Sequence, residues 1–112
     1  RANHDVLDVY EQLRREESER HGPHLRHRIE HVQVLHPGDL RRLADLDVIA
    51  SMQPIHATSD MVMADRYWGE RARYSYAWRT VRDSGALVVF GSDAPVERID
   101  PLPGIHAAVT RR

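Results

Sequence analysis

The sequence predicts an α/β fold built on a parallel sheet. Three short segments with the pattern of strands are centred near Ile29, Ile49 and Val89, and stretches with helical periodicity separate them. The resulting order is helix, strand, helix, strand, helix, strand, helix. Such alternation favours parallel strands joined by right-handed crossovers. No internal repeat or linker interrupts it, so residues 1–112 are expected to form a single unit.

The composition is that of an ordinary globular protein and excludes several functional classes. Apolar residues make up 41% of the chain and charged residues 29%. The net charge of −1 provides no basic field for nucleic acid or anionic lipid, and no apolar stretch approaches the roughly 20 residues of a membrane span. The chain has no cysteine, which excludes disulfides and thiolate ligands and favours a cytoplasmic location. Its eight histidines are many for this length, so their placement matters.

The first element is expected to be a helix over residues 3–20. Apolar side chains recur there at helical spacing, at Val6, Tyr10 and Leu13. Asn3 is a suitable N-cap, because its side-chain oxygen accepts a hydrogen bond from a free backbone N–H. Gly22-Pro23 is expected to end the helix.

Residues 25–34 are expected to form the first strand and to lead into a site. His27 and His31 share one face of this strand, and Arg28 and Glu30 share the other. Polar groups inside a sheet need hydrogen-bond partners, and so many of them are typical of a strand that ends in a site. We interpret Arg28 and Glu30 as a structural ion pair and His27 as a core residue. The histidines in turns or at a helix start are expected at the surface: His4, His21, His24 and His36.

The following elements continue the alternation. A short helix is expected from Pro37 to about Asp47, since proline suits the first helical turn, and a strand over residues 48–52. Residues 53–69 are expected to be a long connection with a short helix at Met61–Met63, and connections of this length tend to be functional. A third helix is predicted over residues 70–84. The last helix begins at Asp100-Pro101.

The segment Leu87–Pro95, LVVFGSDAP, is expected to be a buried strand that ends in a turn. Four apolar residues lead directly into Gly91-Ser92-Asp93. Asp93 then follows the carboxyl end of the strand, where ligands bind in α/β folds. Asp93 also suits a purely structural role as a turn cap.

Three polar side chains follow the three predicted strands. His31 lies near the end of the first strand, His56 lies just after the second, and Asp93 follows the third. The carboxyl ends of parallel neighbours meet at one edge of a sheet, so these side chains are expected to lie together. Imidazole and carboxylate are the usual ligands of Zn²⁺, and a carboxylate beside a metal-bound water can act as general base.

Four segments together resemble the carboxyl-terminal part of the metal-dependent amidohydrolases, in particular the family-3, YtcJ-like branch. They are RHRIEHVQV, VIASMQPIHATSDM, YAWRTVRDSGALVVFGSDAPV and DPLPGIHAAVTR. The combination of IEH, SMQPxH, and GSDxP followed by DPLxGI is specific in this order. The resemblance covers nearly the whole chain.

This resemblance implies a partial (β/α)₈ TIM barrel, with the three strands as barrel strands six, seven and eight. It implies that His31 and Asp93 are metal ligands, that Asp93 is also catalytic, and that His56 lines the substrate site. The implied activity is hydrolysis of non-peptide C–N bonds in small amide or formamide-like substrates by metal-activated water. A divalent metal is implied, with Zn²⁺ as the leading candidate.

The sequence departs from the family pattern by what it lacks. The His-x-His pair of the first barrel strand, the bridging residue of the fourth and the histidine of the fifth are not among these 112 residues. We therefore expect the isolated chain to bind metal weakly and to be inactive. Three strands also leave two sheet edges unpaired, which favours self-association. The alternative interpretation is a non-catalytic truncated fragment or an interaction or regulatory module, although no DNA-binding motif is present.

Overall fold

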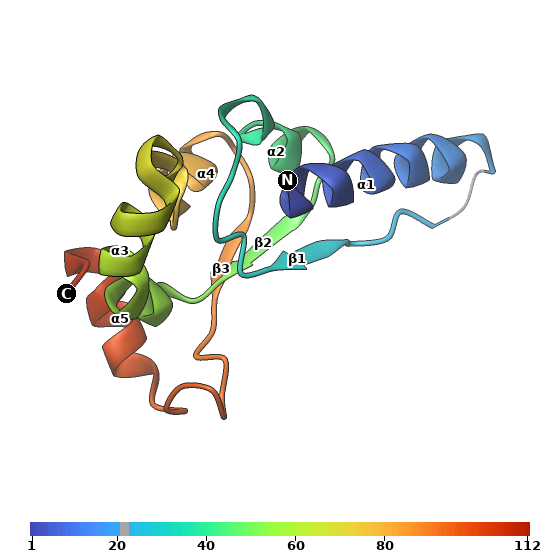
Figure 1. Cartoon of the computed structure of the whole chain (residues 1–112). Helices are drawn as coiled ribbons and strands as arrows, with labels where there is room; N and C mark the ends of the chain where they lie inside the picture. Colours follow the sequence, from blue (N-terminus) through green and yellow to red (C-terminus); the bar gives the residue numbers. More distant parts are fainter. Residues whose placement is uncertain (21–22) are drawn as a thin grey trace.

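The computed structural model describes residues 1–20 and 23–112 (Figure 1). The sequence-based prediction of alternating helices and strands is correct. The elements are α1 (Ala2–Glu19), β1 (Arg28–Glu30), the 3₁₀ helix η1 (Pro37–Asp39), α2 (Arg42–Asp45), β2 (Ile49–Met52), α3 (Pro54–Trp68), the 3₁₀ helix η2 (Gly69–Tyr74), α4 (Trp78–Asp83), β3 (Val88–Phe90) and α5 (Pro101–Thr110). His21 and Gly22, expected at the surface and at the helix end, lie outside the described residues.

The strands form one parallel sheet in the order β1-β2-β3. Ser51 of β2 pairs with Glu30 on one side and with Val89 on the other, so all three strands end at the same edge. The central strand is β2, and three of its four residues are buried. By contrast β3 is an edge strand with an exposed Phe90, so the expectation that Leu87–Pro95 contains a fully buried strand is wrong.

The helices lie in two groups beside this sheet. In Figure 1, α1 lies alongside β1, and α2 lies near the amino end of α1. The helices α3, α4 and α5 gather at the other side of the sheet, where α3 packs against α5. The largest fully buried side chains come from both groups and from the sheet: Leu7, Leu43, Val48, Met52 and Val81. In residues 1–20 and 23–112, no helix combines the length and apolarity that a membrane crossing requires.

Several predicted boundaries are wrong for identifiable physical reasons. The first strand is much shorter than residues 25–34, because His31 and Val32 have positive φ angles of 69° and 43° and turn the chain out of the sheet. The predicted connection over residues 53–69 is the 15-residue helix α3, in which Pro54 occupies the first turn. Met61–Met63 are part of α3 and largely exposed, so they do not form a separate packed helix.

The predicted helix over residues 70–84 is interrupted near its middle. Tyr76 has a φ of 50°, which no continuous α-helix accommodates, and Ser75 forms an isolated bridge with Val34. The segment therefore divides into η2 and the shorter helix α4. Asp100 caps α5 through a 3.0 Å bond from the Leu102 N–H, which confirms the predicted start of that helix.

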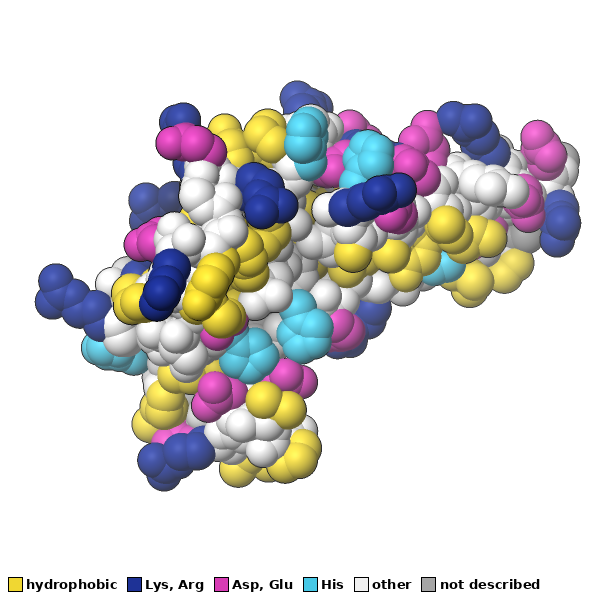
Figure 2. All heavy atoms as spheres, viewed as in Figure 1, with side chains coloured by type: hydrophobic (Ala, Val, Ile, Leu, Met, Phe, Trp, Pro, Cys, Tyr) yellow, Lys and Arg dark blue, Asp and Glu magenta, His cyan; other side chains and the backbone are white. Residues whose placement is uncertain are grey.

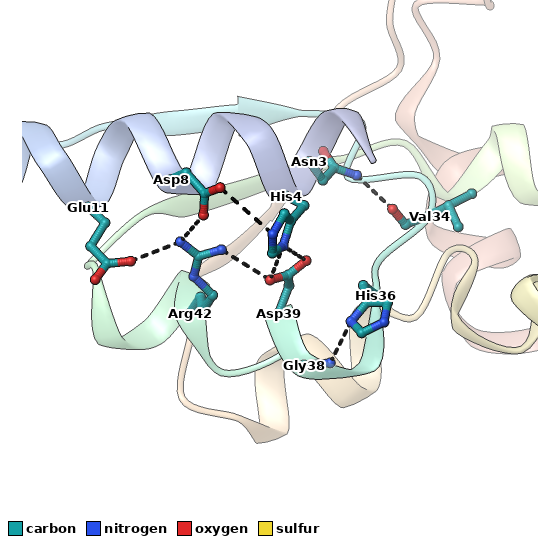
Figure 3. Close-up of polar contacts among 9 residues, drawn as sticks. All are labelled: Asn3, His4, Asp8, Glu11, Val34, His36, Gly38, Asp39 and Arg42. Atoms are coloured by element: carbon teal, nitrogen blue, oxygen red, sulfur yellow. Dashed lines mark hydrogen bonds and ion pairs between the residues drawn. The ribbon is translucent and has the colours of Figure 1, made fainter.

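A buried carboxylate attaches α1 to the segment after β1 (Figure 3). Asp39 is 2% exposed, contacts His4 Nδ1 at 2.9 Å and accepts a hydrogen bond from Arg42 at 3.1 Å. Arg42 also donates to Asp8 at 2.7 Å and to Glu11 at 3.0 Å. His4 is therefore a docking residue, not only a surface histidine. Asn3 is not the N-cap: α1 begins at Ala2, and the Asn3 amide donates to the Val34 carbonyl at 2.8 Å.

We expect Asp39 to make folding stability pH-dependent. Burial alone raises the pKa of Asp39, but hydrogen bonds from His4 and Arg42 outweigh it and hold the pKa below its ordinary value of 3.8. A carboxyl group whose pKa is lowered on folding stabilises the folded state above pH 3.8. This stabilisation is lost as the pH falls through the pKa of the folded state. Asp39→Asn should therefore cost about 1–3 kcal/mol at pH 7 and progressively less at lower pH.

Urea unfolding of wild type and Asp39→Asn between pH 7 and pH 2 measures the difference between their free energies of unfolding. Asp45→Asn is the matched control, because Asp45 is exposed and its closest ion pair, with Arg41, is 3.9 Å long. A constant difference between wild type and Asp39→Asn across the whole pH range would contradict the expectation.

Candidate functional site

His31, His56 and Asp93 lie together at the carboxyl ends of the strands. One ligand atom from each of them lies within 4.8 Å of the others, and we call these three residues the His–His–Asp cluster. The two imidazole rings stack with centroids 5.9 Å apart and planes 20° from parallel. Figure 2 shows histidine and acidic side chains meeting at the centre of one face, above the lobe formed by the segment after β3. The sequence-based expectation that these three side chains converge agrees with this geometry.

His31 is held by its backbone and by a neighbouring glutamine. Its N–H donates to the Ser51 carbonyl at 2.7 Å, which extends the pairing of β1 with β2 by one residue before the chain turns. Its Nδ1 lies 2.8 Å from Oε1 of Gln53, a side chain that is 6% exposed. An amide oxygen accepts a hydrogen bond only from a protonated Nδ1, so this contact leaves Nε2 of the neutral ring free as a ligand.

His56 lies in the first turn of α3 and not in a loop, because Pro54 starts the helix directly after β2. The His56 side chain is 18% exposed. Its Nε2 is buried and makes no hydrogen bond within the described part of the chain. A buried polar atom without a partner is costly and often marks a place where a further group binds.

Asp93 follows β3 by three residues and faces His56. Its φ of 61° is in the left-handed region, which Asp tolerates better than most residues. The Asp93 carbonyl accepts a hydrogen bond from the Val96 N–H at 2.8 Å, so the residue also begins a turn. The turn role and the site role are therefore compatible, since the backbone makes the turn and the carboxylate points at the histidine.

The donor set fits a divalent cation. His56 Nε2 and Asp93 Oδ2 are 3.6 Å apart, which is too long for a hydrogen bond. Two ligands of a tetrahedral ion with bonds of about 2.1 Å lie about 3.4 Å apart, so this separation is close to that of a ligand pair. Two imidazoles and one carboxylate also match the preferences of Zn²⁺.

A second polar cluster joins the segment after His31 to α3 and is not predicted from the sequence. Gln33, two residues after His31, donates to Asp60 at 2.8 Å, and Asp60 lies one helical turn after His56. Tyr76 OH donates to the same carboxylate and also contacts Gln33. Burial, reinforced by the bond to Asp60, raises the pKa of Tyr76. These contacts tie the segment carrying His31 to the helix carrying His56.

The other polar predictions have mixed outcomes. Arg28 and Glu30 do form an ion pair, and the hydrogen bond from Arg28 lowers the pKa of Glu30. His27 is mostly buried, but it stacks on Tyr10 and contacts Glu17 at 3.1 Å instead of joining an apolar core. His24 lies at the surface and contacts Asp47 at 2.9 Å.

Comparison with known proteins shows the family to which the chain belongs. A family model described as "Amidohydrolase family" matches residues 1–112. The chain is 39% identical over 113 residues to the protein LONG AFTER FAR-RED 3 of Arabidopsis thaliana, covering 99% of this chain and 19% of that protein. It is 39% identical over 86 residues to the amidohydrolase-family protein YtcJ of Bacillus subtilis, covering 76% of this chain and 16% of that protein.

Two solved structures resemble the fold. One is an uncharacterized metal-dependent hydrolase from Pyrococcus horikoshii, with a TM-score of 0.77 and 30% identity, covering 95% of this chain and 20% of that one. The other is an uncharacterized metal-dependent hydrolase from Pyrococcus furiosus, with a TM-score of 0.74 and 34% identity, covering 96% of this chain and 20% of that one. The chain thus spans about a fifth of the length of the proteins it matches, and it belongs to the amidohydrolase family.

Proposed function

We propose that this chain carries part of the catalytic site of a metal-dependent hydrolase that cleaves C–N bonds other than peptide bonds. In this proposal β1, β2 and β3 are strands six, seven and eight of a (β/α)₈ barrel, and residues 1–112 form one fragment of it. The location is cytoplasmic, in keeping with a chain that has no cysteine. The observation that carries the proposal is the convergence of His31, His56 and Asp93 at the shared edge of the sheet.

Each member of the His–His–Asp cluster has a separate role. His31 and Asp93 hold the metal, for which Zn²⁺ is the leading candidate, and Gln53 keeps His31 in the tautomer that exposes Nε2. His56 lies beside Asp93, and its Nε2 makes no hydrogen bond in the described part of the chain, so it is available to orient a small amide or formamide-like substrate. This chain supplies fewer protein ligands than a complete catalytic site contains, so its affinity is expected to be weak and the isolated chain inactive.

The chemistry then follows from the positions of the groups. When bound, a divalent cation would supply an acidified water and would polarise the substrate carbonyl. Asp93 accepts the proton from the attacking water oxygen as the new C–O bond forms. Asp93 then passes this proton to the leaving nitrogen as the C–N bond breaks, so that the carboxylate is regenerated.

Single histidine variants separate these roles. His31→Ala should lower the Zn²⁺ affinity by at least about 10-fold, because removing even the partners that orient a ligand costs about 10- to 100-fold. His56→Ala should retain most of the Zn²⁺ affinity but weaken the binding of acetohydroxamate, a small carbonyl compound, to the zinc-loaded chain. Competition with a chromophoric chelator measures the Zn²⁺ affinity, and calorimetry measures the binding of acetohydroxamate.

His36→Ala is the control, since His36 is exposed and only caps the turn at Gly38. Unchanged Zn²⁺ affinity in His31→Ala would overturn the proposed ligand. Equal losses in His31→Ala and His56→Ala would make His56 a metal ligand and would overturn its assignment to the substrate.

A further inference from the structure

We infer that the cavity between α3, α5 and the segment after β3 binds an apolar substituent of the amide substrate. This inference rests on the proposed function and adds a substrate class to it. The cavity has a volume of about 280 Å³. Small-molecule sites usually begin at about 300 Å³, so this volume suits part of a substrate rather than a large ligand.

The cavity adjoins the His–His–Asp cluster. Two of its lining residues, Ile55 and Ser92, directly precede His56 and Asp93 in the sequence. A substrate whose carbonyl lies at the cluster can therefore extend a side group into the cavity without crossing another element. Figure 2 shows that hydrophobic side chains gather on the lobe below the cluster, where the segment after β3 lies.

The cavity walls are mainly apolar and are held by ordered elements. They include Ile55 of α3, Phe90 of β3, Ile99 in the segment before α5, and Pro101 and Ile105 of α5. Asp100 also lines the cavity, but its carboxylate already accepts the Leu102 N–H at 3.0 Å as the helix cap. The other charged lining residues, Glu97 and Arg98, have opposite signs, so the Asp100 carboxylate leaves the lining with a net negative charge that disfavours an anionic group.

Two glycines keep this space open. Gly91 and Gly104 both line the cavity, and a Cβ added at either position meets no atom within 4 Å. Neither glycine has a positive φ angle, so the backbone does not require glycine there. A side chain placed at Gly104 therefore fills space without straining α5, and leucine also has the higher helix propensity.

An apolar subsite makes affinity depend on chain length. Each methylene that moves from water into an apolar site contributes about fourfold to binding. Across acetamide, propionamide, butyramide and hexanamide, the dissociation constant should fall by about fourfold per methylene until the cavity is full. The dependence of the dissociation constant on amide length should be the same with and without Zn²⁺, because the cavity walls contain no member of the His–His–Asp cluster.

The test is NMR titration of the full 112-residue chain with these four amides, without metal. We expect saturable shifts of the Ile55 and Ile105 methyl signals that strengthen along the series, and loss of the length dependence in Gly104→Leu. Val109→Leu is the matched control, since Val109 is on the same helix, 81% exposed and outside the cavity. It should behave as wild type.

Two results would overturn the inference. One is an affinity that does not change with amide length in a folded wild-type chain. The other is occupation of the cavity by a second copy of the chain, seen as dimers in sedimentation that Gly104→Leu dissociates and hexanamide does not. The proposed function is tested separately, by Zn²⁺ binding. If the chain binds Zn²⁺ through His31 but its affinity for amides does not depend on their length, the apolar subsite is rejected and the proposed metal site is retained.

Discussion

Replacing Asp93 with asparagine should weaken Zn²⁺ binding by at least about 100-fold, because an amide of the same size supplies no negative charge to the ion. Asparagine also tolerates the positive φ of 61° at this position, so the turn after β3 should remain intact. The loss of Zn²⁺ affinity therefore measures the role of the Asp93 carboxylate and not a change in the backbone. Chelator competition on folded protein measures it.

Asp83→Asn is the matched control for Asp93→Asn. Asp83 is exposed at the end of α4 and contacts the neighbouring Arg82, well outside the His–His–Asp cluster. Its substitution should leave the Zn²⁺ affinity unchanged. Equal affinities of Asp93→Asn and wild type would show that Asp93 only makes the turn, which was the structural alternative for this residue.

Leu7→Ala should lower the free energy of unfolding by about 2–5 kcal/mol. Leu7 is fully buried and is the only buried residue that the structure describes on α1. The bond from the Tyr10 hydroxyl to the Arg28 carbonyl is exposed and contributes less, whereas the buried carboxylate of Asp39 also attaches α1 through its contact with His4. Since small domains have only about 5–15 kcal/mol of stability, the Leu7 side chain accounts for much of the docking of α1.

Urea unfolding of Leu7→Ala and Val9→Ala tests this role of α1. Val9 is on the same helix and 56% exposed, so its truncation should change stability by less than about 0.5 kcal/mol. Similar small effects of the two substitutions would show that α1 does not pack against the sheet in solution.

The sequence predicts the positions of the strands better than their lengths. Apolar runs locate β2 and β3, whereas β1 contains a single buried apolar residue, Ile29, between Arg28 and Glu30. The early end of β1 depends on positive φ angles at His31 and Val32, which no local pattern indicates. The sequence analysis does not predict helix α3, because a proline directly after a strand also suits a connection; in the structure Pro54 occupies the first turn of that helix.

The candidate site, too, is predicted only in part from the sequence. The convergence of His31, His56 and Asp93 follows from strand order alone, because the carboxyl ends of parallel strands share one edge; their chemical roles stay predictions. The contact of Gln53 with His31 was not foreseen, since it joins residues 22 positions apart. The cluster around Asp60 depends in the same way on tertiary contacts between separate segments.

The most direct test of the proposed metal site is a Zn²⁺ titration of the 112-residue chain, followed through its imidazole ¹H–¹⁵N signals. We expect the His31 signals to shift saturably as those of a ligand, the signals of His56 to respond because its ring lies 5.9 Å from that of His31, those of His24 and His36 to stay constant, and the His56 response to be lost in the His31→Ala, Asp93→Ala double variant. A His56 response that persists in a folded double variant, or a wild-type chain whose His31 signals do not respond to Zn²⁺, would contradict the proposal that these strand ends form a metal site.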